Sequence, residues 1–73
     1  MAEQWGGMMG RYDKVDYYVA VIEDDFADDT VEDNFADAEM VYDHWCKTHP
    51  EARVYILRMD TGRITDERAA TAL

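Results

Sequence analysis

The chain is 73 residues long, carries a formal net charge of −10 at pH 7 and is 48% hydrophobic. A chain of this length forms one domain, and its folding removes only about 60% of the surface of the unfolded chain. These properties exclude a protein that combines a robust core with a deep substrate cavity, and the apolar content excludes a disordered acidic tail. We therefore expect a single folded domain over residues 1–73.

The negative charge is concentrated in one stretch of the sequence. Residues 13–43 contain twelve acidic residues and one basic residue, so this segment has a net charge of −11, whereas the rest of the chain sums to +1. A clustered charge can steer a partner of opposite sign, while a scattered charge mainly keeps a protein in solution. The charge pattern therefore indicates binding rather than a reaction.

The first third of the chain predicts an arm, a strand and a loop. Residues 1–10 contain three glycines and three methionines without a period, which predicts a flexible arm. Residues 15–23 are rich in β-branched and aromatic side chains, which predicts a strand. Both faces of residues 17–22 are apolar, as is typical of a strand in the centre of a sheet. Residues 23–29 (EDDFADD) are predicted to form a loop.

A helix is predicted from about residue 30 to residues 47–48. Asp29 and Thr30 both suit the N-cap, because each is followed three residues later by an acidic residue, as in a capping box. Pro50 disfavours helical geometry at the preceding residue, which sets the end of the helix. Apolar residues recur in this segment at spacings of 4, 3, 4 and 3, which indicates one buried stripe: Val31, Phe35, Ala38, Tyr42 and Trp45.

The last third predicts a hairpin. Residues 53–59 (RVYILRM) predict a second strand, residues 60–62 (DTG) fit a tight turn, and residues 63–66 predict a third strand. The tail at residues 67–73 is expected to form one helical turn or coil. The order strand, helix, strand, strand predicts an α+β fold in which one helix packs on a three-stranded sheet.

The acidic residues of the predicted loop and helix are the candidate partner-binding residues. Asp33 and Asp37, like Glu39 and Asp43, have the i,i+4 relation that places two side chains on the same face of a helix. A basic groove built for a phosphate backbone could accept such a row without reading any base. The predicted partner-binding set is Asp24, Asp25, Asp28, Asp29, Glu32, Asp33, Asp37, Glu39 and Asp43.

The acidic residues could instead serve solubility or salt adaptation. In the first case they form a solvated surface without a partner, and in the second they adapt the protein to high salt. Halophilic adaptation would distribute acid over the entire surface, whereas residues 53–68 are locally basic in parts. The alternative function is a structural or dimerising mini-domain whose acidic surface confers only solubility or salt adaptation.

No metal, cofactor or catalytic site is predicted. Residues 24–29 lack the alternating ligands and the glycine of an EF-hand loop. His44 would lie about 200° around the helix from Cys46, so these two and His49 could not bind one zinc ion together. Paired carboxylates need a cleft to act as general acid and base, and no nucleotide-binding or nucleophile motif occurs. We expect a protein that is not an enzyme.

The acidic residues from Glu23 to Asp43 also carry a resemblance at the level of protein type. A very short, strongly acidic, single-domain α+β chain resembles the inhibitors that phages encode against host nucleic-acid machinery, which include anti-CRISPR proteins and DNA mimics. Those inhibitors share no common fold. The resemblance implies a non-enzymatic inhibitor that occupies a basic channel of its target and blocks the entry of DNA or RNA.

The expected partner is a basic nucleic-acid-binding protein, and a homodimer is an alternative assembly. The sign of the charge opposes direct binding to nucleic acid and to anionic membrane surfaces. No apolar run approaches the roughly 20 residues needed to span a bilayer, and no secretory leader is recognisable. Cys46 is the only cysteine, which excludes an internal disulfide and is typical of a reducing compartment. We therefore expect a cytoplasmic protein without a cofactor.

Overall fold

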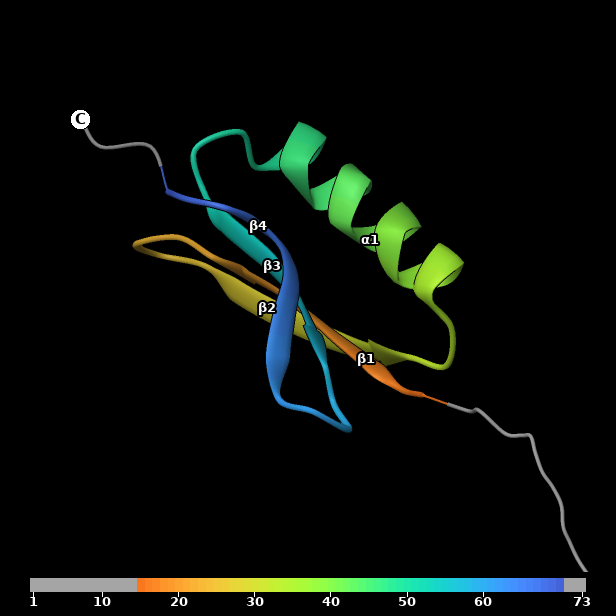
Figure 1. The fold of residues 1–73 in the computed structure, drawn as a ribbon. Helices are drawn as coiled ribbons and strands as arrows, with labels where there is room; N and C mark the ends of the chain where they lie inside the picture. Colours follow the sequence, from red (N-terminus) through yellow and green to blue (C-terminus); the bar gives the residue numbers. More distant parts are fainter. Residues whose placement is uncertain (1–14, 71–73) are drawn as a thin grey trace, which may run out of the picture.

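The computed structural model describes residues 15–70, and the flexible arm expected at residues 1–10 lies outside this part of the chain. The described residues form one helix and a four-stranded antiparallel sheet with strand order β2-β1-β3-β4, so that β2 and β4 are the edges (Figure 1). The elements in chain order are β1 (Tyr17–Ile22), β2 (Ala27–Glu32), α1 (Phe35–Thr48), β3 (Arg53–Arg58) and β4 (Arg63–Arg68).

β1 lies in the interior of the sheet, as its two apolar faces predict. It pairs antiparallel with β2 on one side and with β3 on the other. Val19 and Val21 are fully buried on the face that α1 covers. Ala20, which points to the opposite face because successive side chains of a strand alternate, is only 2% exposed. The prediction of a central strand is confirmed.

The prediction of one strand before the helix, and of three strands in all, is wrong. Residues 27–32 form β2 and pair with β1 along its full length. α1 begins at Phe35, and its N-cap is Asn34, whose side-chain oxygen accepts a 2.8 Å hydrogen bond from the backbone N–H of Asp37. Asp29 and Thr30, the predicted caps, lie inside β2. A strand buried in a sheet needs backbone partners on both sides, and this requirement outweighs the local helix signals.

The core lies between α1 and the sheet (Figure 1). Its fully buried side chains form two groups: Val19, Ala38 and Ile56, and Val21, Ala52 and Val54. Phe35, Tyr42 and Trp45, three members of the predicted apolar stripe, pack against these groups. Val31, the first member of that stripe, instead belongs to β2 and is 53% exposed.

β3 and β4 form the predicted hairpin. Gly62 in the turn has a φ of 72°, a conformation that glycine adopts without steric cost. β4 extends beyond the predicted strand, since Glu67 pairs with Tyr55 and Arg68 pairs with Val54. The expectation of a helical turn or coil is therefore wrong for residues 67 and 68.

The sheet face opposite α1 is covered by no helix or strand of the described residues (Figure 1). We call it the open face. Strand alternation and register place these side chains on it: Tyr18, Ala20 and Ile22 of β1, Ala27, Asp29 and Val31 of β2, Arg53, Tyr55 and Leu57 of β3, and Ile64 and Glu67 of β4.

Candidate functional site

Most of the predicted partner-binding residues follow one edge of the molecule. β2 is an edge strand, with the β1–β2 turn before it and the N-cap of α1 after it. A strand of six residues extends for about 20 Å. We call the carboxylates along this side of the fold the acidic edge: Asp24, Asp25, Asp28, Asp29, Glu32, Asp33 and Asp37.

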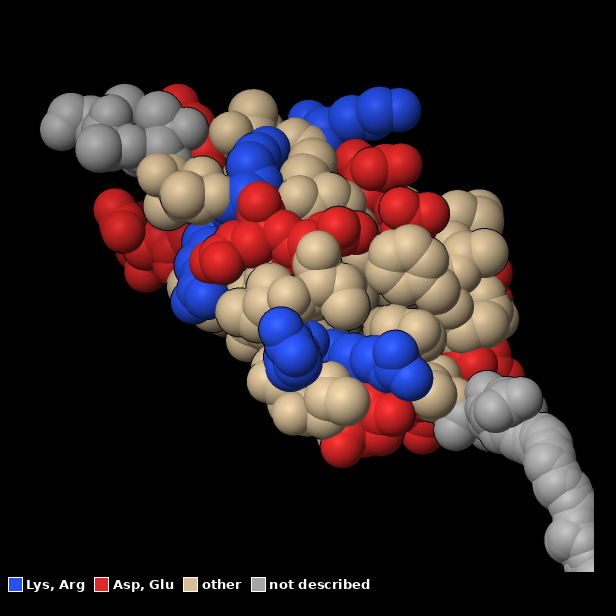
Figure 2. Space-filling model, in the orientation of Figure 1, with Lys and Arg blue, Asp and Glu red and all other residues tan. Residues whose placement is uncertain are grey.

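The cationic side chains of the described residues belong to other elements, and two of them line hollows that the acidic edge also lines: Arg53 with Asp24 and Asp25, and Arg58 with Asp33. These cationic residues belong to the C-terminal turn of α1, to β3 and to β4, the strand at the opposite edge of the sheet: Lys47, Arg53, Arg58, Arg63 and Arg68. Figure 2 shows lysine and arginine side chains beside carboxylates on the side of the molecule where β4 lies in front. Charge is therefore polarised across the sheet, from an acidic β2 side to a mixed β4 side.

Ion pairs within the described residues use other carboxylates. Arg53 pairs with Glu67 at 2.6 Å, Arg58 with Asp60 at 2.8 Å, and His49 contacts Glu23 at 3.2 Å. Six members of the acidic edge pair with no Lys, Arg or His among residues 15–70: Asp24, Asp25, Asp28, Asp29, Glu32 and Asp37. These six carboxylates form no ion pair with those cations, and all of them except the half-buried Glu32 are exposed to solvent.

Hydrogen bonds hold several of these carboxylates in place. Asp37 accepts a 2.9 Å hydrogen bond from the side-chain amide of Asn34, in addition to the cap that Asn34 provides. Thr30 donates a 3.2 Å hydrogen bond to Glu32. Carboxylates fixed in this way lose less side-chain freedom when a partner binds, so less entropy opposes binding.

The Tyr18 hydroxyl on β1 donates a 2.8 Å hydrogen bond to Oδ2 of Asp29 on β2. This hydrogen bond is the main cause of a raised pKa for Tyr18, and desolvation and the charge of Asp29 act in the same direction. The side chain of Asp29 is therefore held on the open face. Successive side chains of a strand point to opposite faces, so Asp28 and Glu32 point to the α1 side of β2. Their register partners on β1 are Val21 and Tyr17.

Glu39 and Asp43 lie apart from the acidic edge. Each helical residue adds a rotation of about 100°, so Asp37 lies about 160° from Glu39 and about 120° from Asp43 around α1. Glu39 and Asp43 therefore point in other directions than Asp37 and are not part of the acidic edge. Asp33 is not on α1, because the helix begins two residues later, so the predicted helical pair with Asp37 does not form.

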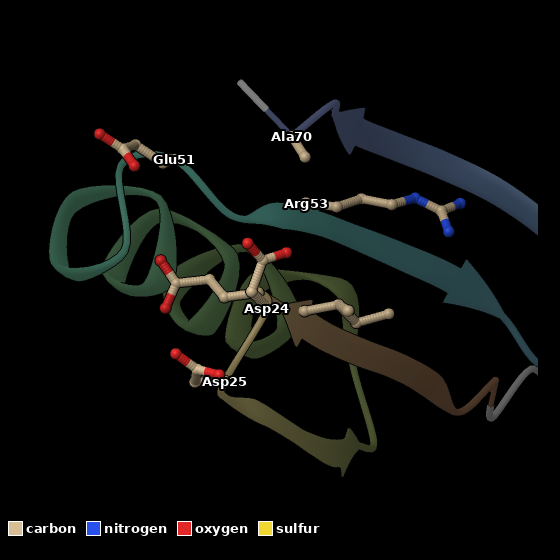
Figure 3. Close-up of a pocket in the computed structure, with 7 residues that line it drawn as sticks. Asp24, Asp25, Glu51, Arg53 and Ala70 are labelled. Carbon is tan, nitrogen blue, oxygen red and sulfur yellow. The ribbon is translucent and has the colours of Figure 1, made fainter. Parts of the chain in front are cut away.

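A hollow of about 490 Å³ lies at the end of the sheet beside the acidic edge. It is lined by Ile22, Glu23, Asp24, Asp25, Glu51, Arg53 and Ala70. Figure 3 shows the Arg53 side chain running along β3, so that its guanidinium points away from Asp24, Asp25 and Glu51. This hollow extends the acidic surface around the β1–β2 turn.

His44 and Cys46 of α1, and His49 at its C-cap, show no arrangement for metal binding. His49 stacks on Phe26 with ring centroids 4.6 Å apart and makes the contact with Glu23, so it joins the end of the helix to the β1–β2 turn. Cys46 is half-buried against the core. Within residues 15–70, no group of three or more His, Cys, Asp or Glu side chains could hold a metal ion.

Sequence reasoning did not identify the open face. Tyr18 and Tyr55 lie on it with ring centroids 6.1 Å apart, and Leu57 lies beside them on β3. The sequence does contain a signal for this face. In residues 17–22 the side chains on both faces of the strand are apolar, and in residues 53–59 Tyr55 and Leu57 are two positions apart and so share one face. A single helix covers only one face of a sheet, so the side chains on the other face remain uncovered by it.

Comparisons with protein-family models, with curated proteins and with solved structures find no match for this chain. Among residues 15–70, no helix has the length and apolar character needed to cross a membrane. The features that define the protein are therefore its small α+β fold, the acidic edge along β2 and the open sheet face. Any functional conclusion depends on these surfaces.

Proposed function

We propose that this protein is a small non-enzymatic binding protein that docks its acidic edge onto a basic, nucleic-acid-binding surface of a partner protein and competes there with nucleic acid. The observation that carries the proposal is the polarised charge, since the acidic edge has seven carboxylates while the described Lys and Arg residues lie on α1, β3 and β4. Such competition is the mode of action of the DNA-mimic inhibitors that the sequence resembles.

The acidic edge has the properties of an electrostatic docking surface. Exposed carboxylates of one sign steer a basic partner and accelerate association, and a groove that binds phosphates recognises charge without reading bases. Residence time depends more on apolar side chains buried at the contact. Phe26, at the start of the acidic edge and 38% exposed, and Val31 on β2 are the apolar groups placed to provide such contacts.

The proposal is tested by capture of partners and by competition. The protein is immobilised, incubated with a cell lysate with and without nuclease treatment, and each captured protein is then assayed for loss of bound fluorescent DNA. We expect a basic DNA- or RNA-binding protein that is captured after nuclease treatment and releases DNA when this protein is added. Binding should weaken steeply as salt rises, because exposed charges are screened over about 10 Å at 0.1 M.

Two matched triple variants locate the docking surface. The first reverses three carboxylates of the acidic edge, Asp28→Lys, Glu32→Lys and Asp37→Lys. The second makes the same change in net charge away from that edge, Glu39→Lys, Asp43→Lys and Asp60→Lys. We expect the first variant to lose at least about tenfold in affinity and the second to change much less, since local charges dominate at short range. An equal loss of affinity in the two variants contradicts the proposal. So does a capture experiment in which the immobilised protein retains only further copies of itself from the lysate.

A dimerising mini-domain is the second candidate function, and the open face is the observation that favours it. Ile22 is 41% exposed and Ile64 is 43% exposed on this face. In this case the carboxylates of β2 confer solubility and prevent the edge strand from pairing with a strand of another chain. Sedimentation equilibrium over a range of concentrations tests the candidate, and a dimer that Val31→Lys dissociates would support it.

A further inference from the structure

The open face contains a guanidinium held jointly by a tyrosine ring and a carboxylate. The central guanidinium carbon of Arg53 lies 4.6 Å from the centroid of the Tyr55 ring. Nε of the same group donates a 2.6 Å hydrogen bond to Glu67 on the neighbouring strand β4. A cation over an aromatic face is attracted by the negative potential of the ring, and the carboxylate pairs with its charge. The fold therefore already builds one arginine site from a ring and an acid.

A second ring and carboxylate lie beside the first. The Tyr18 hydroxyl on β1 donates a hydrogen bond to Asp29 on β2, and the Tyr18 ring centroid lies 6.1 Å from that of Tyr55. Ala20 is the register partner of both Asp29 and Tyr55, so the position between the two sites carries a small side chain. Within residues 15–70 no Lys or Arg forms a cation–ring contact with Tyr18 or an ion pair with Asp29.

We propose that the open face binds an arginine side chain of the partner protein, whose guanidinium stacks on the ring of Tyr18 and pairs with Asp29. This inference rests on the proposed function, because it takes the partner to be a basic protein, and it names the side chain that the partner contributes. The arrangement repeats the contacts that Arg53 makes with Tyr55 and Glu67.

The surroundings of Tyr18 fit an arginine better than a lysine. A planar guanidinium stacks on an aromatic ring and donates to a carboxylate at the same time, whereas an ammonium is a strongly hydrated point charge. The aliphatic stem of an arginine packs on apolar surface. Val31, the register partner of Tyr18, and Ile22 provide exposed apolar surface on the same face.

Asp29 connects the acidic edge to the open face. It belongs to β2, and its carboxylate lies on the open face, so a partner seated along the acidic edge has this carboxylate within the same contact. Surfaces that bind nucleic-acid phosphates are rich in arginine, because its fork of donors matches phosphate and carboxylate oxygens alike. The occupant that the charge favours is thus the arginine of a basic protein rather than a second copy of this acidic chain.

Two peptides of equal length and charge provide the probes, hexa-arginine and hexa-lysine. Each is titrated into the full-length protein at low salt, and binding is followed by NMR chemical-shift changes of backbone amides and tyrosine ring protons. We expect hexa-arginine to bind at least about fivefold more tightly than hexa-lysine, in line with the stronger stacking of guanidinium. The largest shifts specific to hexa-arginine should fall on Tyr18 and Asp29.

Three single variants separate the ring from the carboxylate and from the hydroxyl. Tyr18→Leu removes the ring and should abolish the preference for arginine, while Tyr18→Phe keeps a ring and should retain most of it. Asp29→Asn keeps the size of the side chain and should weaken the binding of both peptides, with the larger loss for hexa-arginine. Because Tyr18→Phe and Asp29→Asn are nearly isosteric, they test the site even if Tyr18→Leu perturbs the fold.

The outcomes distinguish this inference from the proposed function. Equal affinity for both peptides, with shifts confined to the acidic edge, overturns the arginine site and leaves the function standing. Failure of both peptides to bind at low salt overturns the function together with the site. Shifts on the open face that grow with protein concentration in the absence of peptide identify a second copy as the occupant and also overturn the inference.

Discussion

The guanidinium of Arg68, on the edge strand β4, donates a 2.9 Å hydrogen bond to the backbone carbonyl oxygen of Cys46 in the last turn of α1. The same side chain donates to the carbonyl oxygens of His49 and Ala52 after the helix. The last carbonyl groups of a helix lack partners within it, and the helix dipole favours a cation at this end. Arg68 therefore links the C-terminal end of α1 to the edge strand β4 by hydrogen bonds.

We expect Arg68→Leu to lower the free energy of unfolding by about 2 kcal/mol, because it leaves partly buried carbonyl groups without a donor. The loss should not be larger, because the buried Nε of Arg68 has no hydrogen-bond partner among residues 15–70, and the substitution removes the cost of burying it. Urea unfolding at pH 7 measures the change. Arg63→Leu, at an exposed position of the same strand, is the control and should change stability by less than about 0.5 kcal/mol. An equal loss in both variants would show that Arg68 has no special role.

Asn34 should matter as the start of α1. Its side-chain oxygen accepts the backbone N–H of Asp37, so Asn34→Ala is expected to cost about 1 kcal/mol of stability. Asn34→Ser keeps a capping oxygen and should cost only a few tenths of a kcal/mol. Thermal unfolding followed by circular dichroism tests both variants. A neutral Asn34→Ala would mean that another residue caps the helix.

The acidic edge should destabilise the fold slightly at low salt. Asp28 is exposed on β2 and makes no ion pair with residues 15–70, so Asp28→Asn should raise stability by a few tenths of a kcal/mol. This gain should disappear at 1 M salt, where the screening length is about 3 Å. Asp60→Asn is the control, because Asp60 pairs with Arg58, and it should bring no gain at either salt concentration. A gain that persists at high salt would exclude repulsion as its cause.

Stability should fall at alkaline pH because of Tyr18. The hydrogen bond to Asp29, burial and nearby negative charge raise the pKa of Tyr18 in the folded protein. A raised pKa means that the protonated hydroxyl contributes stability that is fully present below the usual value of about 10 and is lost as pH rises through the raised pKa. Tyr18→Phe should therefore lose less stability than the wild type between about pH 9 and about pH 12. Urea unfolding across this range measures the difference.

Tyr42 provides an internal comparison for the alkaline prediction. Burial raises the pKa of its hydroxyl, and nearby Cys46 and Asp66 act in the same direction while Arg68 opposes them. Its contribution has the same sign as that of Tyr18, so Tyr18→Phe should reduce the alkaline loss without abolishing it. Identical pH profiles for Tyr18→Phe and the wild type would contradict a role for the Tyr18–Asp29 hydrogen bond.

Parts of the fold were predictable because their signals are local. The apolar run around Val19 and Val21 predicts a central strand, and the turn at Gly62 predicts the hairpin that follows. Phe35, Tyr42 and Trp45 predict the buried side of α1. These features arise from side-chain size, polarity and backbone freedom at neighbouring positions, which the sequence displays directly.

β2 was not predictable in the same way. Residues 27–32 contain four polar or acidic residues, and Asp29 with Glu32 matches a helix start as well as Asn34 does. The segment becomes a strand because the backbone of β1 requires a partner on the side that β3 does not occupy. Because residues 27–32 form a strand, most of the carboxylates predicted for the loop and the helix face lie along an edge of the sheet instead. Glu39 and Asp43 remain on α1, apart from that edge.

The order of residues alone determined that this protein has a compact apolar core and a segment of strongly negative charge, since both follow from which side chains are present and how they are spaced. Tertiary pairing decided where that charge lies, because a strand and a helix point the same side chains in different directions. It also brought Tyr18 to Asp29 and Arg53 to Glu67, contacts between strands that no local pattern specifies. The acidic edge and the open face are therefore properties of the folded sheet.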